Sequence, residues 1–526
     1  MADQSEKVAA AALAISAAGL LLYRRYASSS ATPKASSALK AKIALYGQNA
    51  AADSDGSAWL DVLAKAANVP LDSQDFAAQM DAADPLRHIR SEFHIPPIDA
   101  ADGGACAWSD GSSSSKSEPA EQAYFAGNSL GLLPKVTRAH VGAELDKWGA
   151  RGVMGHFEGA LPWATCEDQI PPLVADLVGA KEPALEVGAM NSLTVNLHML
   201  MAAFYRPTDG RAAIIIEAGA FPSDRYAVGS QIIHHGRDPS EWLIEVQPRA
   251  DGLLHTEDIL EAVRANESRL ALVLLGGVNY LTGQLLDLPA ISAHMQALNA
   301  ARSAKGQPII PFGLDLAHAV GNVPLALHDW QVDFAAWCTY KYLNSGAGCL
   351  SGIFVHAKHA DDGDKFPRLS GWWGVPFARR FKMAHKYEEA KGAAGFGVSN
   401  VNMLMAACVK ASLLVFRKAG GIMALRRKSI LLTAYMERLI QCRGLQITIQ
   451  TPADPTRRGC QLSLRVTGSG TLTMRALEEA LRARGVVGDA REPDIVRLSP
   501  APLYNNFTDV RRAIDALELC LQHKDL

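Results

Sequence analysis

The chain has 526 residues, enough for two or three domains around a large hydrophobic core. Hydrophobic residues make up 48% and charged residues 20% of the sequence, and the formal net charge is -2, so the composition argues against a nucleic-acid partner. The eight cysteines are far apart and include no Cys-x-x-Cys pair, which argues against a disulfide framework and a zinc site and indicates a reducing compartment.

An apolar segment near the N-terminus departs from this ordinary composition. Residues 8–23 are apolar and uncharged, and Arg24 and Arg25 follow at once. A helix over this segment would just cross a bilayer core of about 30 Å, with the basic pair on the cytosolic side, as in a membrane anchor. A weakly hydrophobic targeting or disordered tail explains the segment equally well. Both alternatives place the rest of the chain in the cytoplasm.

Composition and periodicity divide the sequence into five parts. A tail over residues 1–42 precedes a helical arm over 43–98. The run 99–122 is rich in Gly, Ser and acidic residues, and we expect it to be a disordered loop. A large domain over 123–400 follows, and a smaller α+β domain over 401–526 ends the chain.

Short apolar strands alternate with helical patterns in the large domain, which predicts an α/β fold with a mostly parallel sheet covered on both faces. The expected strands span 212–217, 270–278, 308–315, 332–339 and 352–356, and the expected helices about 193–205, 223–235, 256–266 and 289–303. In the smaller domain we expect helices at 401–418, 421–441, 473–484 and 508–522 and strands at 459–466 and 494–498.

Chemically distinctive residues follow three of the expected strands. Asp315 ends one strand, with His318 just beyond it, and Lys341 follows the next strand along the chain. Phe221 and Asp224 come shortly after an earlier strand. In open α/β sheets, ligands bind outside the carboxyl ends of the strands. These five side chains are therefore candidates for one site.

These residue types suit pyridoxal 5′-phosphate, whose aldehyde needs a lysine, whose ring nitrogen needs a carboxylate and whose phosphate needs donors. Lys341 and Asp315 would fill the first two roles. The free amides of Leu193 and Thr194, at the start of an expected helix, would hold the phosphate. Phe221 would stack on the ring.

Seven motifs occur in the order and at the spacing found in kynureninases, over roughly residues 85–520, and the chain resembles that family. They are YFAGNSLGL, AFPSD, DLAHAVGN, YKYLN, GWWG, FGVSN and PLYN. The resemblance implies a fold type I, aspartate-aminotransferase-like homodimer with Lys341 as the Schiff-base lysine. It implies further cofactor contacts from Trp372 and Asn400 across the dimer interface. The contacts implied within one subunit are Leu193, Thr194, Phe221, Asp224, Asp315, His318 and Tyr340.

The same resemblance implies hydrolysis of 3-hydroxy-L-kynurenine, and of L-kynurenine, to L-alanine and 3-hydroxyanthranilate or anthranilate. This reaction belongs to tryptophan catabolism and NAD biosynthesis. Lys341 would remove the α-proton, Asp315 would keep the cofactor ring charged, and Tyr340 would transfer the later proton. Gly276 departs from the family, which has a serine near the cofactor at this position, so one hydroxyl contact is absent.

The resemblance also assigns the substrate contacts. Arg497 matches the family's clamp for the substrate carboxylate, a role that suits the paired donors of a guanidinium. Ser129, His156 and Asn400 match the pocket for the aromatic ring, where a His/Asn pair goes with preference for the 3-hydroxylated substrate. We therefore expect 3-hydroxykynurenine to be the better substrate.

The residues alone leave alternatives open. Asp315 and His318 could form a metal pair, but no third ligand lies close in sequence, and we expect no metal site. The glycine-rich run 345–352 is more typical of a tight turn than of a phosphate loop. A class V aminotransferase or a cysteine desulfurase would share the fold. A non-catalytic, membrane-tethered scaffold would have lost Lys341 or Asp315, and the chain keeps both.

Overall fold

The computed structural model forms two compact units. The first unit contains residues 1–133 and 424–526, and the second contains residues 134–423. The ranges that the structure describes are 34–48, 56–98, 120–466 and 473–522.

Two predictions fall outside those ranges. The apolar segment 8–23 is one, and most of the expected loop 99–122 is the other. Among the described helices, none is long and apolar enough to cross a membrane.

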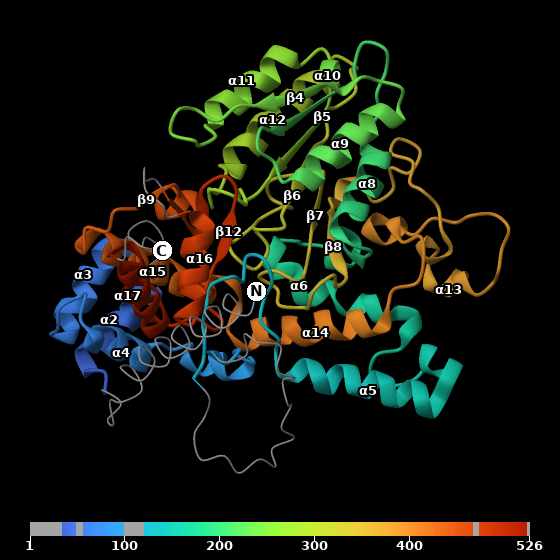
Figure 1. Cartoon of the computed structure of the whole chain (residues 1–526). Helices are drawn as coiled ribbons and strands as arrows, with labels where there is room; N and C mark the ends of the chain where they lie inside the picture. The colour runs from blue at the N-terminus through green and yellow to red at the C-terminus, as the bar shows by residue number, and fades with distance from the viewer. Residues whose placement is uncertain (1–33, 49–55, 99–119, 467–472, 523–526) are drawn as a thin grey trace, which may run out of the picture. The chain divides into compact units, whose positions relative to one another are not determined.

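A seven-stranded sheet with the order β2-β8-β7-β6-β5-β3-β4 forms the centre of the second unit (Figure 1). The five strands from β7 to β4 pair in parallel, whereas β8 is antiparallel to both of its neighbours. The strands are β2 (Val187–Met190), β3 (Ala213–Glu217), β4 (Leu243–Val246), β5 (Leu270–Gly276), β6 (Phe312–Asp315), β7 (Phe334–Trp337) and β8 (Ser351–Val355).

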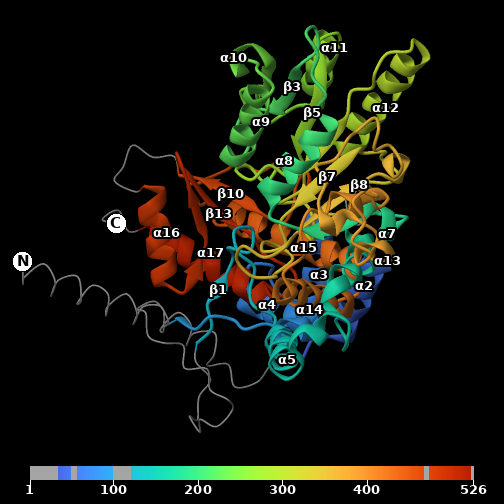
Figure 2. The same ribbon diagram turned by 90° about the vertical axis from the view of Figure 1, so that its right-hand side faces the viewer.

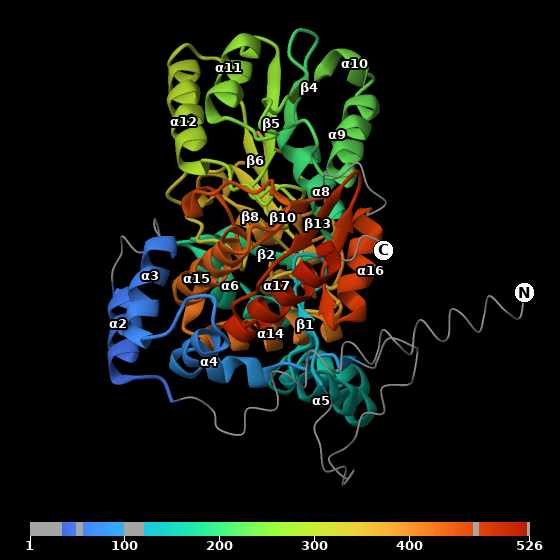
Figure 3. The same ribbon diagram turned by 60° about the vertical axis from the view of Figure 1, so that its left-hand side comes forward.

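Helices cover both faces of this sheet, which explains why its strands are continuous apolar runs without polar alternation. Figures 1 and 3 show α9 on one side of the strands and α12 on the other. Every residue of β3, β6 and β7 is buried. The helices of this unit are α5 (Val136–Arg151), α6 (Pro171–Val178), α7 (Pro183–Glu186), α8 (Leu193–Phe204), α9 (Pro222–His234), α10 (Pro239–Trp242), α11 (Thr256–Asn266), α12 (Leu288–Ala304), α13 (Phe377–Arg380) and α14 (Met403–Lys418).

The expectation of a mostly parallel sheet is confirmed, and β8 is the strand that runs against its neighbours. A parallel neighbour requires a crossover of a dozen or more residues, usually a helix that packs on the sheet. The chain instead reverses directly between β7 and β8 through a turn in which Gly346 and Gly348 have φ values of 98° and 68°. Lys341 lies on this reversing segment, just after β7. β2 and β4 are further strands that the sequence did not predict, each only four residues long.

The first unit combines the N-terminal arm with the C-terminal part of the chain. It contains an antiparallel sheet with the order β12-β13-β10-β9 and a parallel pair, β1 with β11. Its strands are β1 (Ala123–Tyr124), β9 (Thr448–Ile449), β10 (Leu462–Arg465), β11 (Val486–Val487), β12 (Asp489–Arg491) and β13 (Ile495–Leu498). Its helices are α2 (Ser37–Gln48), α3 (Gly56–Ala67), α4 (Gln74–Ala83), α15 (Gly421–Cys442), α16 (Met474–Ala483) and α17 (Phe507–Gln522).

One hydrophobic core joins these distant segments of the first unit. α4 packs against α17, as Figure 3 shows, and α16 also packs against α17 (Figure 2). The centre of the Tyr435 ring lies 5.6 Å from the centre of the Phe76 ring and 5.6 Å from that of the Phe507 ring. Residues 123–133, expected to begin the large domain, belong to this unit, whereas α14, expected to begin the small domain, belongs to the second.

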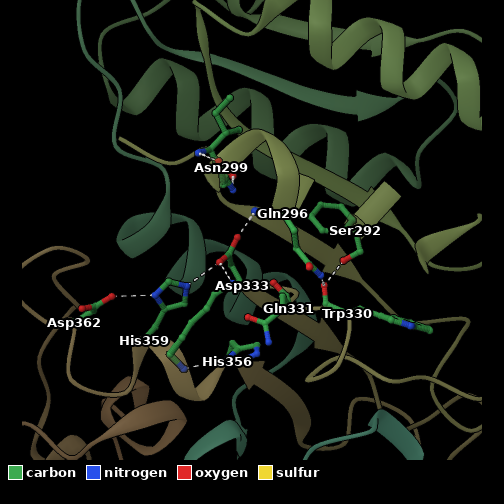
Figure 4. Close-up of polar contacts among 12 residues, drawn as sticks. Ser292, Gln296, Asn299, Trp330, Gln331, Asp333, His356, His359 and Asp362 are labelled. Carbon is green, nitrogen blue, oxygen red and sulfur yellow. Dashed lines mark hydrogen bonds and ion pairs between the residues drawn. The ribbon is translucent and has the colours of Figure 1, made fainter. Parts of the chain in front are cut away.

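A buried carboxylate fixes the amino-terminal ends of β6 and β7 in the second unit. Asp333 is 2% exposed, and it accepts hydrogen bonds from the Phe312 amide (2.7 Å), from His359 Nε2 (2.8 Å) and from Lys358 Nζ (2.8 Å). Figure 4 shows His359 between Asp333 and Asp362. Burial alone would raise the pKa of Asp333, but the hydrogen bond from His359 and the charge of Lys358 lower it to about 2.

The Asp333→Asn variant should be less stable than the wild type by about 2 kcal/mol at pH 7. Because the folded-state pKa of Asp333 is depressed, its contribution is complete above the unfolded-state value of 3.8 and is lost as the pH falls through about 2. The difference in urea midpoint between variant and wild type should therefore shrink between pH 5 and pH 2. Asp361→Asn, at an exposed ion pair, is the control. A pH-independent difference would contradict this assignment.

Candidate functional site

A cavity of about 240 Å³ in the second unit lies at the carboxyl ends of the parallel strands. β3, β5 and β6 end there with Glu217, Gly276 and Asp315. Nine of the predicted site residues line it: Leu193, Thr194, Phe221, Asp224, Gly276, Asp315, His318, Tyr340 and Lys341. The side chains that follow the strand ends in sequence therefore meet in one pocket.

Lys341 presents its amine inside this cavity. Its Nζ lies 2.9 Å from His318 Nε2, 5.8 Å from the centre of the Phe221 ring and 6.0 Å from that of Tyr340. The imidazole can accept a hydrogen bond from the ammonium group, so His318 orients the amine. Phe221 is 45% exposed, so it is only partly covered by its neighbours in the cavity.

Three residues with carboxyl groups line the same cavity: Asp224, Asp315 and Glu217. Burial raises the pKa of Asp315, and burial together with the neighbouring Asp315 raises the pKa of Asp224 well above its usual range. Asp224 and Asp315 share a hydrogen bond that raises the pKa of Asp224 and lowers that of Asp315, so a proton held by the pair favours Asp224. Asp315 Oδ1 also accepts the Ala317 amide at 2.7 Å. A cationic ring nitrogen beside Asp315 would offset a negative charge on this buried carboxyl group.

Glu217 is the third carboxyl group, and the sequence analysis missed it because it ends an otherwise apolar strand. Both of its oxygens lie near the Gly276 amide, at 3.0 and 3.1 Å. Burial raises its pKa to about 7. A Cβ atom at Gly276 would lie 2.6 Å from Glu217 Oε1, so the family's serine at this position would require Glu217 to shift.

The first turn of α8 forms the anion-binding side of the cavity. Ser192 precedes the helix without capping it through its side chain, and the amides of Leu193 and Thr194 have no partner within the helix. Thr194 Oγ1 and Ser223 Oγ lie 2.8 Å apart at the starts of α8 and α9. Two helix N-termini with hydroxyl groups suit a phosphate. The lysine, carboxylate and phosphate subsites together fit pyridoxal phosphate.

Three predicted residues of the second unit do not line this cavity. Trp372 is 46% exposed and donates from Nε1 to the Arg380 carbonyl at 2.9 Å. Asn400 is exposed, and His156 Nδ1 lies 3.0 Å from the Val153 carbonyl. Trp372 belongs to an exposed aromatic cluster in which Phe381 contacts three rings: Phe157, Trp372 and Phe377.

The remaining predicted residues, Ser129 and Arg497, lie in the first unit. Arg497 is on β13 and is 1% exposed. Its Nη2 lies 2.5 Å from Asp489 Oδ2 and 3.1 Å from Ser129 Oγ. Ser129 and Arg497 thus belong to one polar cluster, although we expected them to bind different parts of the substrate.

Two other polar clusters of the second unit are internally satisfied. Glu186, His328 and His356 have ligand-type atoms within 4.8 Å of one another. However, His356 Nε2 bonds the His328 carbonyl and its Nδ1 accepts the Lys358 amide, so neither nitrogen is available to a metal. A cavity of about 540 Å³ lies beside Asp333, and its amide side chains bond to the backbone (Figure 4). Both clusters are structural.

Solved structures define the class of protein to which this fold belongs. A variant of the enzyme C-DES, with glycine covalently linked to its PLP cofactor, is 19% identical with a TM-score of 0.60 and covers 76% of this chain and 96% of its own. The cysteine desulfurase CsdA from Escherichia coli is 15% identical with a TM-score of 0.62, and the match covers 83% of this chain and 98% of CsdA. The fold is that of the fold type I PLP-dependent enzymes.

Sequence comparison identifies the family within that class. The kynureninase of Xanthomonas campestris pv. campestris (strain B100) is 48% identical over 448 residues, which cover 85% of this chain and 97% of that protein. The kynureninase of Nematostella vectensis is 44% identical over 468 residues, which cover 86% of this chain and 95% of that protein. Residues 425–517 match the model of the kynureninase C-terminal domain. The chain belongs to the kynureninase family.

The raised pKa of Glu217 predicts a pH-dependent destabilisation of the cofactor-free protein. Its folded-state pKa of about 7 lies above the unfolded-state value of 4.5, so the folded state loses about 3 kcal/mol as the pH rises from 4.5 to above 7. Glu217→Gln cannot ionise, and its carbonyl can still accept the Gly276 amide. The variant should therefore melt at a higher temperature than the wild type at pH 8 but not at pH 4.5.

The exposed Glu261→Gln variant is the control for this measurement. An equal effect of Glu217→Gln at both pH values would show that ionisation of Glu217 is not the cause.

Proposed function

We propose that this chain is a PLP-dependent hydrolase that cleaves the side chain of kynurenines. Water and 3-hydroxy-L-kynurenine, or L-kynurenine, give L-alanine and 3-hydroxyanthranilate, or anthranilate. One observation carries the proposal in this family member: Lys341, the buried charge of Asp315 and the free amides of α8 line a single cavity. Identity of 48% to a kynureninase favours this activity over an aminotransferase or a cysteine desulfurase.

Each residue of the cavity has a proposed role. Bound pyridoxal phosphate supplies the electron sink for loss of the substrate's α-proton and for cleavage of its Cβ–Cγ bond. Lys341 holds the cofactor and takes the α-proton on Nζ, and His318 orients that amine. Asp315 keeps the ring nitrogen protonated, with Asp224 as the donor that fixes Asp315. Phe221 stacks on the ring, and the amides of Leu193 and Thr194 bind the phosphate.

Tyr340 is the proposed donor of the later proton, which it delivers to the three-carbon fragment that becomes alanine. Burial raises the pKa of Tyr340, so its hydroxyl group stays protonated at neutral pH. Arg497 is the proposed partner of the substrate carboxylate, and Ser129 and His156 are proposed to contact the aromatic ring. Gly276 supplies its amide beside the cofactor but no hydroxyl group.

A homodimer is part of the proposal. The exposed cluster around Phe381 would be covered by a second copy of the chain, since contiguous exposed aromatic side chains mark interaction surfaces. Trp372 and Asn400 would then complete the partner's site. We further propose that the enzyme acts in the cytoplasm, in tryptophan catabolism and NAD biosynthesis.

Replacing Lys341 by Ala should lower kcat by at least about a thousandfold, because the general base is lost. Borohydride treatment should fix the cofactor covalently to the wild type on the peptide that contains Lys341, and not to the variant, as mass spectrometry would detect. Lys391→Ala, at an exposed lysine, should behave as the wild type. A variant with wild-type turnover of both kynurenines would refute the proposal.

The enzyme should have a higher kcat/KM for 3-hydroxykynurenine than for kynurenine, because a polar pocket built for a hydroxyl group rejects the analogue that lacks it. His156→Ala should reduce the ratio of the two kcat/KM values about tenfold. Steady-state kinetics on both substrates tests this. An equal or higher kcat/KM for kynurenine in the wild type would exclude the predicted preference.

A further inference from the structure

Arg497 is held by a carboxylate on the neighbouring strand. β12 and β13 are antiparallel, and their register places Asp489 directly opposite Arg497. Paired residues project from the same face of a sheet, so the two side chains meet, with Nη2 and Oδ2 2.5 Å apart. The Asp489 side chain is only 10% exposed and that of Arg497 only 1%. An isolated guanidinium buried to this extent would be costly, and Asp489 compensates its charge.

Asp489 also organises two further groups. Arg491 approaches it with Nη1 2.7 Å from Oδ1 and Nη2 3.0 Å from Oδ2. The Ser129 hydroxyl group donates to Oδ2 and accepts from the Nη2 atoms of Arg497 and Arg491, both at 3.1 Å. One carboxylate thus fixes two guanidinium groups and a hydroxyl group.

The charges of this cluster have a consequence for an anionic ligand. Two arginines and one aspartate leave a net charge of +1, so the cluster still attracts a carboxylate. Asp489 has two opposing effects on such a ligand. It weakens the attraction, because it carries the same charge as the ligand, and it strengthens binding, because it holds Arg497 in one orientation. The ordering of a long side chain before binding lowers the entropy cost of association.

We propose that Asp489 is a positioning residue: it fixes Arg497 in the orientation that receives the substrate's α-carboxylate. The gain in binding from this orientation exceeds the loss from the repulsion between Asp489 and the ligand. This inference rests on the proposed function, in which Arg497 is the carboxylate partner. The two effects predict opposite results for Asp489→Asn. Loss of orientation weakens binding of the carboxylate, whereas loss of the negative charge alone strengthens it.

The test compares KM and kcat for kynurenine in the wild-type holoenzyme and in Asp489→Asn. We expect KM to rise about tenfold and kcat to change less than about threefold. Asp494→Asn is the matched control, because Asp494 pairs with Arg465 outside the cluster, and its KM should stay within about twofold of the wild type. An unchanged or lower KM in Asp489→Asn would overturn the proposal.

A second measurement separates positioning from a structural role. Kynuramine lacks the α-carboxylate of kynurenine, so its inhibition constant should change less than about twofold in Asp489→Asn. An equal loss for both ligands would overturn the proposal. If Asp489→Asn melts at a lower temperature than the wild type, Asp489→Glu separates positioning from loss of stability, because glutamate retains the charge. A KM of Asp489→Glu within about threefold of the wild type supports the positioning role. A KM as high as that of Asp489→Asn refutes it.

Failure of the proposed function is distinguishable from failure of this inference. A wild-type enzyme that turns over neither kynurenine refutes the function. Calorimetric binding of kynurenine to the Lys341→Ala protein, with and without Asp489→Asn, then tests Asp489 independently of turnover. Equal affinities in that pair would refute the positioning role.

Discussion

The buried negative charge at the end of β6 is the constraint on which the candidate site depends. Asp315 is enclosed by apolar strands, and its hydrogen bond with Asp224 raises the pKa of Asp224 and lowers that of Asp315. Two ionised carboxylates in this position would repel each other in a medium of low dielectric constant. The cavity therefore favours a ligand that brings a positive charge on a flat ring. Lys341 supplies a second cation, but on a flexible chain that His318 must orient.

The first unit presents the opposite electrostatic arrangement. Arg497 and Arg491 outnumber the single carboxylate of Asp489, so this cluster attracts an anion. An amino-acid substrate carries its own carboxylate, while the cofactor proposed for the cavity of the second unit carries a positively charged ring. The two units thus differ in the charge of the ligand that each favours. In both cases a neighbouring acid, Asp224 or Asp489, fixes the residue that would touch the ligand.

The sequence predicts the positions of the central strands well because each is a short apolar run followed by residues that do not fit a strand. Asp315 and Lys341 could be singled out for this reason, and their meeting in one cavity follows from the parallel order of β6 and β7. The reversal of β8 could not be predicted with the same rule, since strand direction depends on the connection and not on the strand's composition. Glu217 was missed because a single acidic residue at the end of a strand is usually solvated.

Contacts that depend on register were also beyond the sequence. Asp489 and Arg497 are eight residues apart, and only the pairing of β12 with β13 makes them direct neighbours. Likewise, Ser129 joins Arg497 through a fold that brings together residues more than 360 positions apart in the chain. Trp372 and Asn400 could be placed in a site only through the family resemblance, because their own surroundings in the chain are open surface.

The core that α4 shares with α17 has a consequence for how the protein is made. Its N-terminal helices emerge from the ribosome first, but α17, the partner of α4, begins at Phe507, 424 residues after α4 ends at Ala83 and beyond the whole second unit. At about 5–20 residues per second, α4 must wait about 20–85 s for that partner. During that interval Leu60, Phe76 and Met80, which are fully buried in the finished core, lack their partners. Translation thus sets a period in which these apolar side chains lack the surface that finally buries them.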